Sequence, residues 1–207
     1  ASFENNSING NSGHAILIPC ECLHQISSNN SISCATNYGV EIWGEFSQTQ
    51  ATINKLTVPY YVNNAGAVYV IGDITVAPGV EFRFDGESYF ELYEPNSRLN
   101  AVGTETDRII FTTSATSPAA GAWVGIVFET DCSPNSILSY CDISYGGKDT
   151  YYAGNISIAN VTVTVSNCNI SNSEQYGIYL IGEGQLSDTS TGNVFTSNGL
   201  GDIGTNE

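Results

Sequence analysis

The sequence predicts an all-β protein, a parallel β-helix in which the chain winds in stacked coils. No stretch of helical length shows apolar residues at three-to-four spacing, and one phrase of sequence recurs along the chain. That phrase is an Asn-rich corner, an apolar residue, a polar loop and then Gly before an aliphatic stretch. It occupies 5–18, 29–42 and 167–180, and its first two copies start 24 residues apart. Recurrence at this interval is typical of a solenoid.

Short stretches of alternating apolar and polar residues are the predicted strands, because period-two alternation places one set of side chains on one face of a sheet. In chain order they lie at 79–84, 89–94, 107–113, 137–143 and 160–166. Asn-Gly and Asp-Gly pairs, which mark tight hairpins, are scarce, and this favours coils over a hairpin-built sandwich or barrel. At the corners, Asn amides are expected to hydrogen-bond from coil to coil, and Gly supplies positive φ.

The chain has 207 residues, enough for one domain, and no linker interrupts it. We expect a single β-helix segment over 1–207. Within it, 1–57 forms N-terminal coils with a Cys-containing insertion, and 58–207 forms the main run of coils.

Charge excludes some partners. Five Lys and Arg stand against 21 Asp and Glu, for a net charge of −16, so a nucleic-acid backbone or an anionic membrane surface would be repelled. The longest apolar run, at 119–128, is too short to span a bilayer, which predicts no membrane insertion. The acidic surface leaves calcium binding possible, although no cofactor is required.

Six Cys in a Lys-poor chain predict an extracellular or cell-surface location.

The stretch 58–180 resembles the right-handed parallel β-helix repeat proteins of large secreted and cell-surface bacterial polypeptides. The resemblance rests on "GDITVAPGVEFRF", "RLNAVGTETDRIIFTT", "AGAWVGIVF", "ILSYCDISYGG" and "NCNISNSEQYGIYL". It implies right-handed winding. It is much less specific for function, because such coils serve adhesins, stalks, polysaccharide-active enzymes and binding modules alike.

The resemblance implies what a polysaccharide-cleaving enzyme of this kind would need: for acidic polysaccharides, a cationic base such as Arg or Lys beside a calcium held by carboxylates, and for hydrolysis, a cluster of Asp residues with a His. The five Lys and Arg are scattered along the chain, and no Asp cluster accompanies His14 or His24. We therefore expect a protein that is not an enzyme. A polysaccharide lyase or hydrolase is the enzymatic alternative.

The cysteines leave three interpretations open. All six are disulfide candidates: Cys20, Cys22, Cys34, Cys132, Cys141 and Cys168. A zinc site of Cys20, Cys22, His24 and Cys34 is the second interpretation, and free core thiols are the third. Cys141 and Cys168 occupy equivalent places in "SYCDIS" and "SNCNIS", which predicts inward positions on stacked coils, where a bridge is permitted but not required.

Tyrosines are the candidate ligand-contacting residues. Tyr89, Tyr93, Tyr151 and Tyr152 lie near polar and acidic groups, where exposed rings could stack on sugars or on a protein partner, or could cover solenoid corners. An outward Thr ladder beginning at Thr162 and Thr164 would suit ice binding, a less favoured alternative.

The repeats start and end without a capping helix, and uncapped coils expose strand edges. The sequence therefore predicts a non-enzymatic extracellular structural or adhesive segment of a filament, stalk or surface protein. Its partners would be neighbouring repeats or other copies stacked end to end, with surface glycans as a further candidate. A carbohydrate-binding or polysaccharide-cleaving β-helix module is the alternative.

Overall fold

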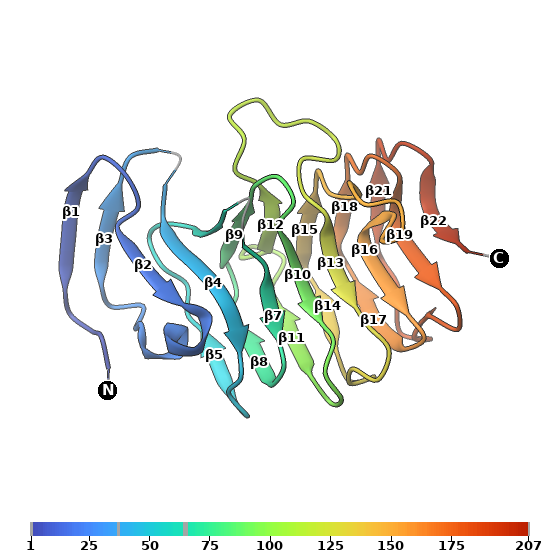
Figure 1. Cartoon of the computed structure of the whole chain (residues 1–207), viewed down its shortest axis with the longest axis horizontal. Helices are drawn as coiled ribbons and strands as arrows, with labels where there is room; N and C mark the ends of the chain where they lie inside the picture. The colour runs from blue at the N-terminus through green and yellow to red at the C-terminus, as the bar shows by residue number, and fades with distance from the viewer. Residues whose placement is uncertain (1, 37, 64–65, 207) are drawn as a thin grey trace.

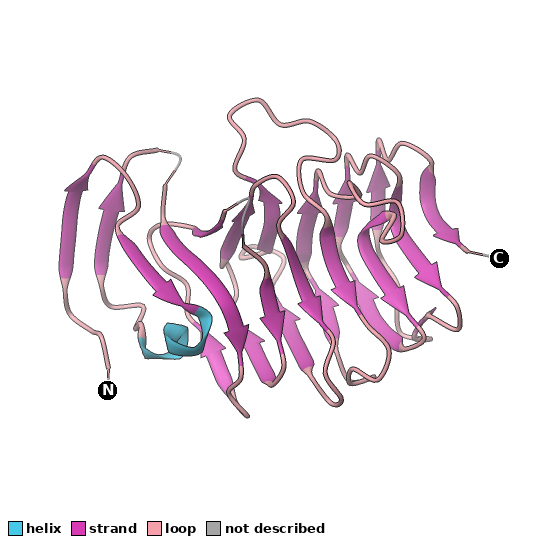
Figure 2. Cartoon of the chain, in the orientation of Figure 1, coloured by secondary structure: helices cyan, strands magenta, loops and turns pink. Residues whose placement is uncertain are grey.

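The computed structural model describes residues 2–36, 38–63 and 66–206. The chain forms an all-β solenoid of about 8 turns, and every strand pairing in it is parallel (Figures 1 and 2). In Figure 1 the chain advances from left to right, runs downward through the strands in front and upward through those behind. This is a right-handed winding, as the resemblance implied.

Each full coil contributes one strand to each of three faces of the solenoid, which we call the front, upper back and lower back sheets. The front and upper back sheets are joined into one 14-stranded sheet, because β4 (Val40–Phe46) pairs with β6 (Tyr60–Val62) near its start and with β7 (Val68–Val70) near its end, and the lower back sheet is a separate six-stranded sheet. The front sheet of Figure 1 contains β4 (Val40–Phe46), β7 (Val68–Val70), β10 (Tyr89–Leu92), β13 (Gly125–Phe128), β16 (Gly154–Ala159), β19 (Tyr176–Ile181) and β22 (Gly201–Thr205). The upper back sheet contains β6 (Tyr60–Val62), β9 (Glu81–Phe84), β12 (Ile109–Thr113), β15 (Cys141–Ser144), β18 (Asn169–Ser171) and β21 (Val194–Thr196). The lower back sheet contains β5 (Ala51–Ile53), β8 (Asp73–Val76), β11 (Arg98–Val102), β14 (Ile137–Ser139), β17 (Thr162–Ser166) and β20 (Gln185–Leu186).

The N-terminal coils are built from β1 (Ser7–Asn11), β2 (Ile16–Pro19) and β3 (Ser31–Cys34), with a short 3-10 helix, η1 (Cys20–Gln25). The first two copies of the repeated phrase stack directly on each other. Ser7 pairs with Ser31 between β1 and β3, and Ile16 pairs with Val40 between β2 and β4. The interval between the copies is therefore one coil, as predicted, whereas the phrase itself covers only two of the coil's sides.

Asn side chains join successive coils at the corners, as predicted. Asn30 accepts a hydrogen bond from the backbone N–H of Asn6 (2.9 Å) and donates to the carbonyls of Phe3 and Ser27. Near the C-terminal end, Asn193 accepts from the N–H of Cys168 at 3.0 Å. Each such amide supplies a partner for turn backbone that would otherwise be unsatisfied.

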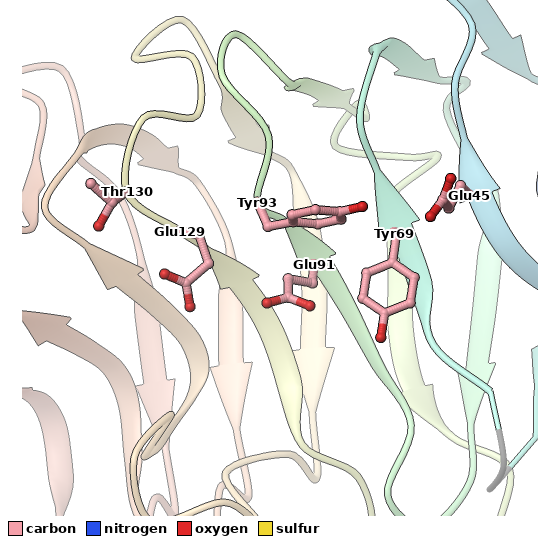
Figure 3. Close-up of a pocket in the computed structure, with 6 residues that line it drawn as sticks. All are labelled: Glu45, Tyr69, Glu91, Tyr93, Glu129 and Thr130. Carbon is pink, nitrogen blue, oxygen red and sulfur yellow. The ribbon is translucent and has the colours of Figure 1, made fainter.

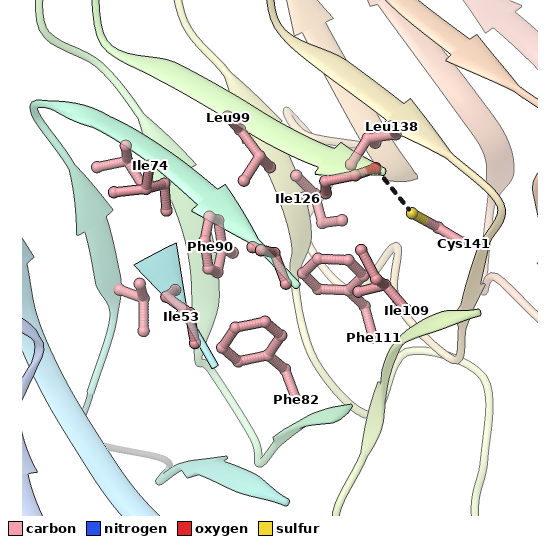
Figure 4. Packing of buried hydrophobic residues seen from close by; sticks show 14 of the residues in the cluster. Ile53, Ile74, Phe82, Phe90, Leu99, Ile109, Phe111, Ile126, Leu138 and Cys141 are labelled. Atoms are coloured by element: carbon pink, nitrogen blue, oxygen red, sulfur yellow. Dashed lines mark hydrogen bonds between the residues drawn. The ribbon is translucent and has the colours of Figure 1, made fainter. Parts of the chain in front are cut away.

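The core runs along the solenoid axis, where inward side chains of the three sheets meet. Figure 4 shows Ile74 and Leu99 from the lower back sheet, Phe90 from the front sheet, and Phe82 and Phe111 from the upper back sheet. The rings of Phe82 and Phe111 stack 5.2 Å apart. Burying a side chain of this size contributes about 2 kcal/mol, so each coil is stabilised mainly by its contacts with its neighbours.

Two details differ from the sequence prediction. The stretch 137–143 is two strands, β14 and β15, because Tyr140 adopts φ 50 and turns the chain from one sheet to the next. The Cys-containing insertion holds η1, a helix of one or two turns that lacks the three-to-four apolar period of a longer helix.

Within the described residues, no helix is long and apolar enough to cross a membrane.

Candidate functional site

The outer face of the front sheet carries a row of carboxylates and aromatic rings. The strand register places Glu45 beside Tyr69, and Tyr69 beside Glu91, on the adjacent strands β4, β7 and β10. These are the outward positions of strands whose alternate residues, such as Val68 and Phe90, fill the core. Because the pairing is parallel and in register, the row runs along the solenoid axis.

Six residues line a hollow of about 590 Å³ on this face: Glu45, Tyr69, Glu91, Tyr93, Glu129 and Thr130. Figure 3 shows the ring of Tyr69 face-on and the ring of Tyr93 edge-on, with the Tyr93 hydroxyl directed toward Glu45. The two ring centroids lie 5.4 Å apart at an interplanar angle of 82°. The Tyr69 ring therefore forms a flat aromatic platform, and the Tyr93 ring stands nearly perpendicular to it as a wall on one side.

A second hollow of about 400 Å³ adjoins the first, and Tyr69 lines both. Trp43 and Tyr89 lie on its walls, and Trp43 is 41% exposed. The hydroxyls of Tyr69 and Tyr89 form a hydrogen bond of 2.8 Å, and their rings meet edge to face. Four aromatic side chains thus share one stretch of the front sheet with carboxylates.

The carboxylates of the hollow lie close enough to influence one another. Burial, and then the charge of Glu129, raises the pKa of Glu91 to about 7. Glu129 itself accepts a hydrogen bond from the Tyr152 hydroxyl. Near neutral pH a fraction of Glu91 is therefore protonated, and a carboxylic acid can both donate and accept hydrogen bonds.

The segment Lys148–Tyr152, which we call the strap, leads into β16 and reaches back over the front sheet. Its turn is fixed by Asp149, whose Oδ1 accepts hydrogen bonds from the backbone N–H groups of Tyr151 (2.6 Å) and Tyr152 (2.9 Å). Lys148 pairs with Glu87 at 2.8 Å. Gln175 donates to the carbonyl of Asp149 at 2.8 Å.

The structure brings three of the four predicted tyrosines to this face. Tyr89 and Tyr93 lie on or beside β10, and Tyr152 reaches the hollow from the strap. Tyr151 is 60% exposed at the strap surface, and its ring meets that of Tyr152 at 4.9 Å. Whether these rings contact a ligand remains a prediction.

The sequence reasoning missed Trp43, Tyr69, Glu45, Glu91 and Glu129. A usable signal was present in "VYV" (68–70) and "FEL" (90–92), where the middle residue of an apolar triplet must face outward. What the pattern could not supply was which outward residues stack on the same row.

The structure does not support the disulfide prediction, since no two of the six cysteines are bonded to each other and all six are free thiols. Cys20, Cys132, Cys141 and Cys168 are buried, while Cys22 and Cys34 are partly exposed. The prediction that Cys141 and Cys168 point inward on neighbouring coils is confirmed, and their thiols donate to backbone carbonyls. Burial raises the pKa of Cys132 to about 12, so this thiol behaves as a small apolar group.

Metal ligands do not converge either. Among the described residues, no group of three or more His, Cys, Asp or Glu side chains could hold a metal ion, so the structure does not support the zinc interpretation of Cys20, Cys22, His24 and Cys34. Calcium binding stays a prediction. Each of the five Lys and Arg residues pairs with a carboxylate. The pairs are Lys55–Asp107, Arg83–Glu81, Arg98–Asp73, Arg108–Asp142 and Lys148–Glu87.

The outward row that includes Thr164 is not a Thr ladder. It begins with Thr52 and Thr75 on β5 and β8, but Asn100 and Ile137 occupy the next two coils before Thr164. The regular hydroxyl spacing on which the ice-binding alternative depended is interrupted in this row.

Comparisons of this chain with protein-family models, with curated proteins and with solved structures gave no match.

Proposed function

We propose that this protein is a non-enzymatic β-solenoid module that binds a neutral glycan on the outer face of its front sheet. The observation that carries the proposal is the Tyr69 platform, walled by Tyr93 and flanked along the row by Glu45 and Glu91. Aromatic faces pack against the apolar C–H faces of sugar rings, and carboxylates accept hydrogen bonds from sugar hydroxyls.

The charge of the site selects a neutral ligand over an acidic one. Glu45, Glu91 and Glu129 line the hollow, and the nearest strap cation, Lys148, is paired with Glu87. An anionic polysaccharide would meet like charge at Glu45 and Glu129, and at Glu91 in those molecules where it is ionised. We therefore expect uronic-acid-rich and sulfated glycans to bind more weakly than neutral ones.

The test is calorimetric titration of the protein against a panel of neutral and acidic oligosaccharides. Tyr69→Ala and Tyr93→Ala should each weaken binding about ten-fold or more, equivalent to about 1.4 kcal/mol. Tyr61→Ala is the matched control, because Tyr61 lies on β6 of the upper back sheet, away from the hollow. Failure of every glycan to bind, or an equal loss in the Tyr61 variant, would rule the proposal out.

Extracellular or cell-surface location and an adhesive role belong to the same proposal. Surface and environmental glycans are met outside the cell, and no cofactor is needed for stacking and hydrogen bonding. The polar, carboxylate-rich exterior supports this setting. Secretion of a tagged chain and protease accessibility on intact cells would test it.

A second proposal is end-to-end association or continuation of coils in a filament or stalk. In the described residues β22 pairs with β19 alone and β1 with β3 alone, so both edges carry unpaired backbone groups. Val194, Leu200 and Ile203 are exposed apolar residues near the C-terminal edge. An apolar strand edge is a template for pairing with another chain.

A further inference from the structure

Ser157 is a buried hydroxyl without a partner on the outer face of the front sheet. It lies in β16, is 1% exposed, and its Oγ makes no hydrogen bond. Leaving a buried hydroxyl unsatisfied costs free energy of folding, so natural proteins rarely keep one without a reason. Position 157 should face solvent, because its neighbours Ile156 and Ile158 fill the core.

The register places Ser157 in the same row as the proposed glycan platform. From Tyr69 the row continues through Glu91, Val127 and Ser157 to Tyr179. Those are four strand spacings of about 4.8 Å, or about 19 Å along the axis. The hollow at Tyr69 is therefore one end of a longer row.

Aromatic rings also form the other end of that row. Tyr176 and Tyr179 stack with centroids 5.4 Å apart and an interplanar angle of 12°. Gly204 makes room for them, since a Cβ there would come within 2.6 Å of the Tyr176 ring. Both tyrosines are partly exposed, so this stacked pair is a second flat aromatic surface on the front sheet.

The strap separates the two aromatic surfaces. It enters β16, and its Tyr152 hydroxyl contacts Glu129 beside β13, so it crosses the stretch where Val127 and Ser157 are buried. Figure 1 shows the loop between β15 and β16 lying in front of the sheet. Backbone hydrogen bonds from Gly147 to Val124 and from Lys148 to Trp123 fix the start of the strap. Beyond them it is held by the partly exposed Lys148–Glu87 pair and by the Gln175 amide, which donates to the carbonyls of Gly147 and Asp149. Because a surface ion pair adds little stability, the Lys148 and Gln175 side chains are the contacts to remove in a test of opening.

We propose that a second saccharide subsite lies beneath the strap, formed by Ser157 and the Tyr176–Tyr179 pair and continuous with the Tyr69 hollow. The inference rests on the proposed glycan binding and deepens it. The ligand is then a linear neutral polysaccharide running along the solenoid axis. Displacement of the strap exposes the Ser157 hydroxyl, and a sugar hydroxyl becomes the partner that it lacks.

Strap opening is tested without any ligand. In a Ser157→Cys variant, maleimide labelling followed by peptide mass mapping reports access to position 157. Adding Lys148→Ala and Gln175→Ala, which remove two tethers, should raise the labelling rate about ten-fold. The native, fully buried Cys141 is the internal control, because it labels only when the coil unfolds. Labelling of residue 157 that stays as slow as that of Cys141, with or without the tethers, would overturn the subsite.

Ligand length is the second test. Neutral β-1,4-linked gluco-oligosaccharides of increasing length are titrated against the wild-type protein and Tyr179→Ala. We expect affinity to rise with length, and the variant to lose this gain while binding the shortest ligand normally. Length-independent binding refutes the subsite but leaves the Tyr69 site standing. If no oligosaccharide of this length series or of the neutral and acidic panel binds, both the Tyr69 glycan site and the second subsite are ruled out.

Discussion

Single polar side chains decide how the strap and its neighbouring corner are held. Asn155 is fully buried, accepts a hydrogen bond from the Gly146 N–H (2.7 Å) and donates to the Ser171 carbonyl (2.9 Å). It therefore links the base of the loop that carries the strap to the upper back sheet. A buried amide in this position is worth more to stability than an exposed one.

We predict that Asn155→Ala lowers the free energy of unfolding by about 2 kcal/mol, because two buried backbone groups lose their partner. Urea denaturation followed by circular dichroism measures this. Asn169→Ala is the control, since Asn169 is exposed and its side-chain amide donates to the Asp142 carboxylate. Equal losses in the two variants would show that Asn155 is not the structural link described.

Glu91 should make stability depend on pH. Its pKa is raised from 4.5 to about 7 by burial and by Glu129. Between these values the folded state keeps a proton that the unfolded state releases, so stability falls as pH rises through this window. Glu91→Gln should flatten that fall, as seen in urea midpoints across the window. Glu94→Gln changes an exposed carboxylate nearby and should leave the fall in stability with pH unchanged. If the Glu91 variant loses as much stability as the wild-type protein over this pH range, the assignment to Glu91 is wrong.

At the scale of elements, each coil depends on its neighbours. The inward column of the upper back sheet passes from Phe111 through Ile143 and Ile170 to Phe195 on successive strands. A strand therefore loses apolar contacts on both sides when one of these positions is made polar. Coils in such a stack unfold together rather than singly.

We predict that Ile170→Asp destabilises the protein by roughly 4 kcal/mol or more, because it buries a charge without a partner. Hydrogen exchange should accelerate in β15, β18 and β21 together. Val194→Asp is the matched control, since Val194 is exposed on the adjacent β21 and should cost no more than about 0.5 kcal/mol. Wild-type thermal stability of the Ile170 variant would refute the inward assignment.

At the scale of the whole molecule, the two proposals use two different surfaces of the solenoid. Its side presents the front-sheet row, where a ligand would lie parallel to the axis. Its ends present strand edges, where another coil would add in the direction of the ladder hydrogen bonds. The net charge of −16 opposes close approach of two copies and makes such addition dependent on salt.

We predict that purified protein forms end-to-end assemblies at high concentration, more readily as salt screens the repulsion. Electron microscopy and light scattering over a concentration series would detect them. Ile203→Asp adds a negative charge to the exposed C-terminal edge, which increases the repulsion, and should suppress assembly without changing the fold. Strictly monomeric protein under all these conditions would leave glycan binding as the function to pursue.

The sequence by itself determined the fold class, the one-coil repeat, the Asn-linked corners and the inward positions of Ile170 and Cys141, because all of these follow from local periodicity. Only the tertiary structure decided which outward residues share a row. Coils differ in length, so Tyr69, Glu91 and Ser157 are unevenly spaced along the chain yet lie on one line. The free state of the cysteines and the contacts of the strap also depend on how distant segments pack against each other. Residue spacing along the chain does not specify that packing.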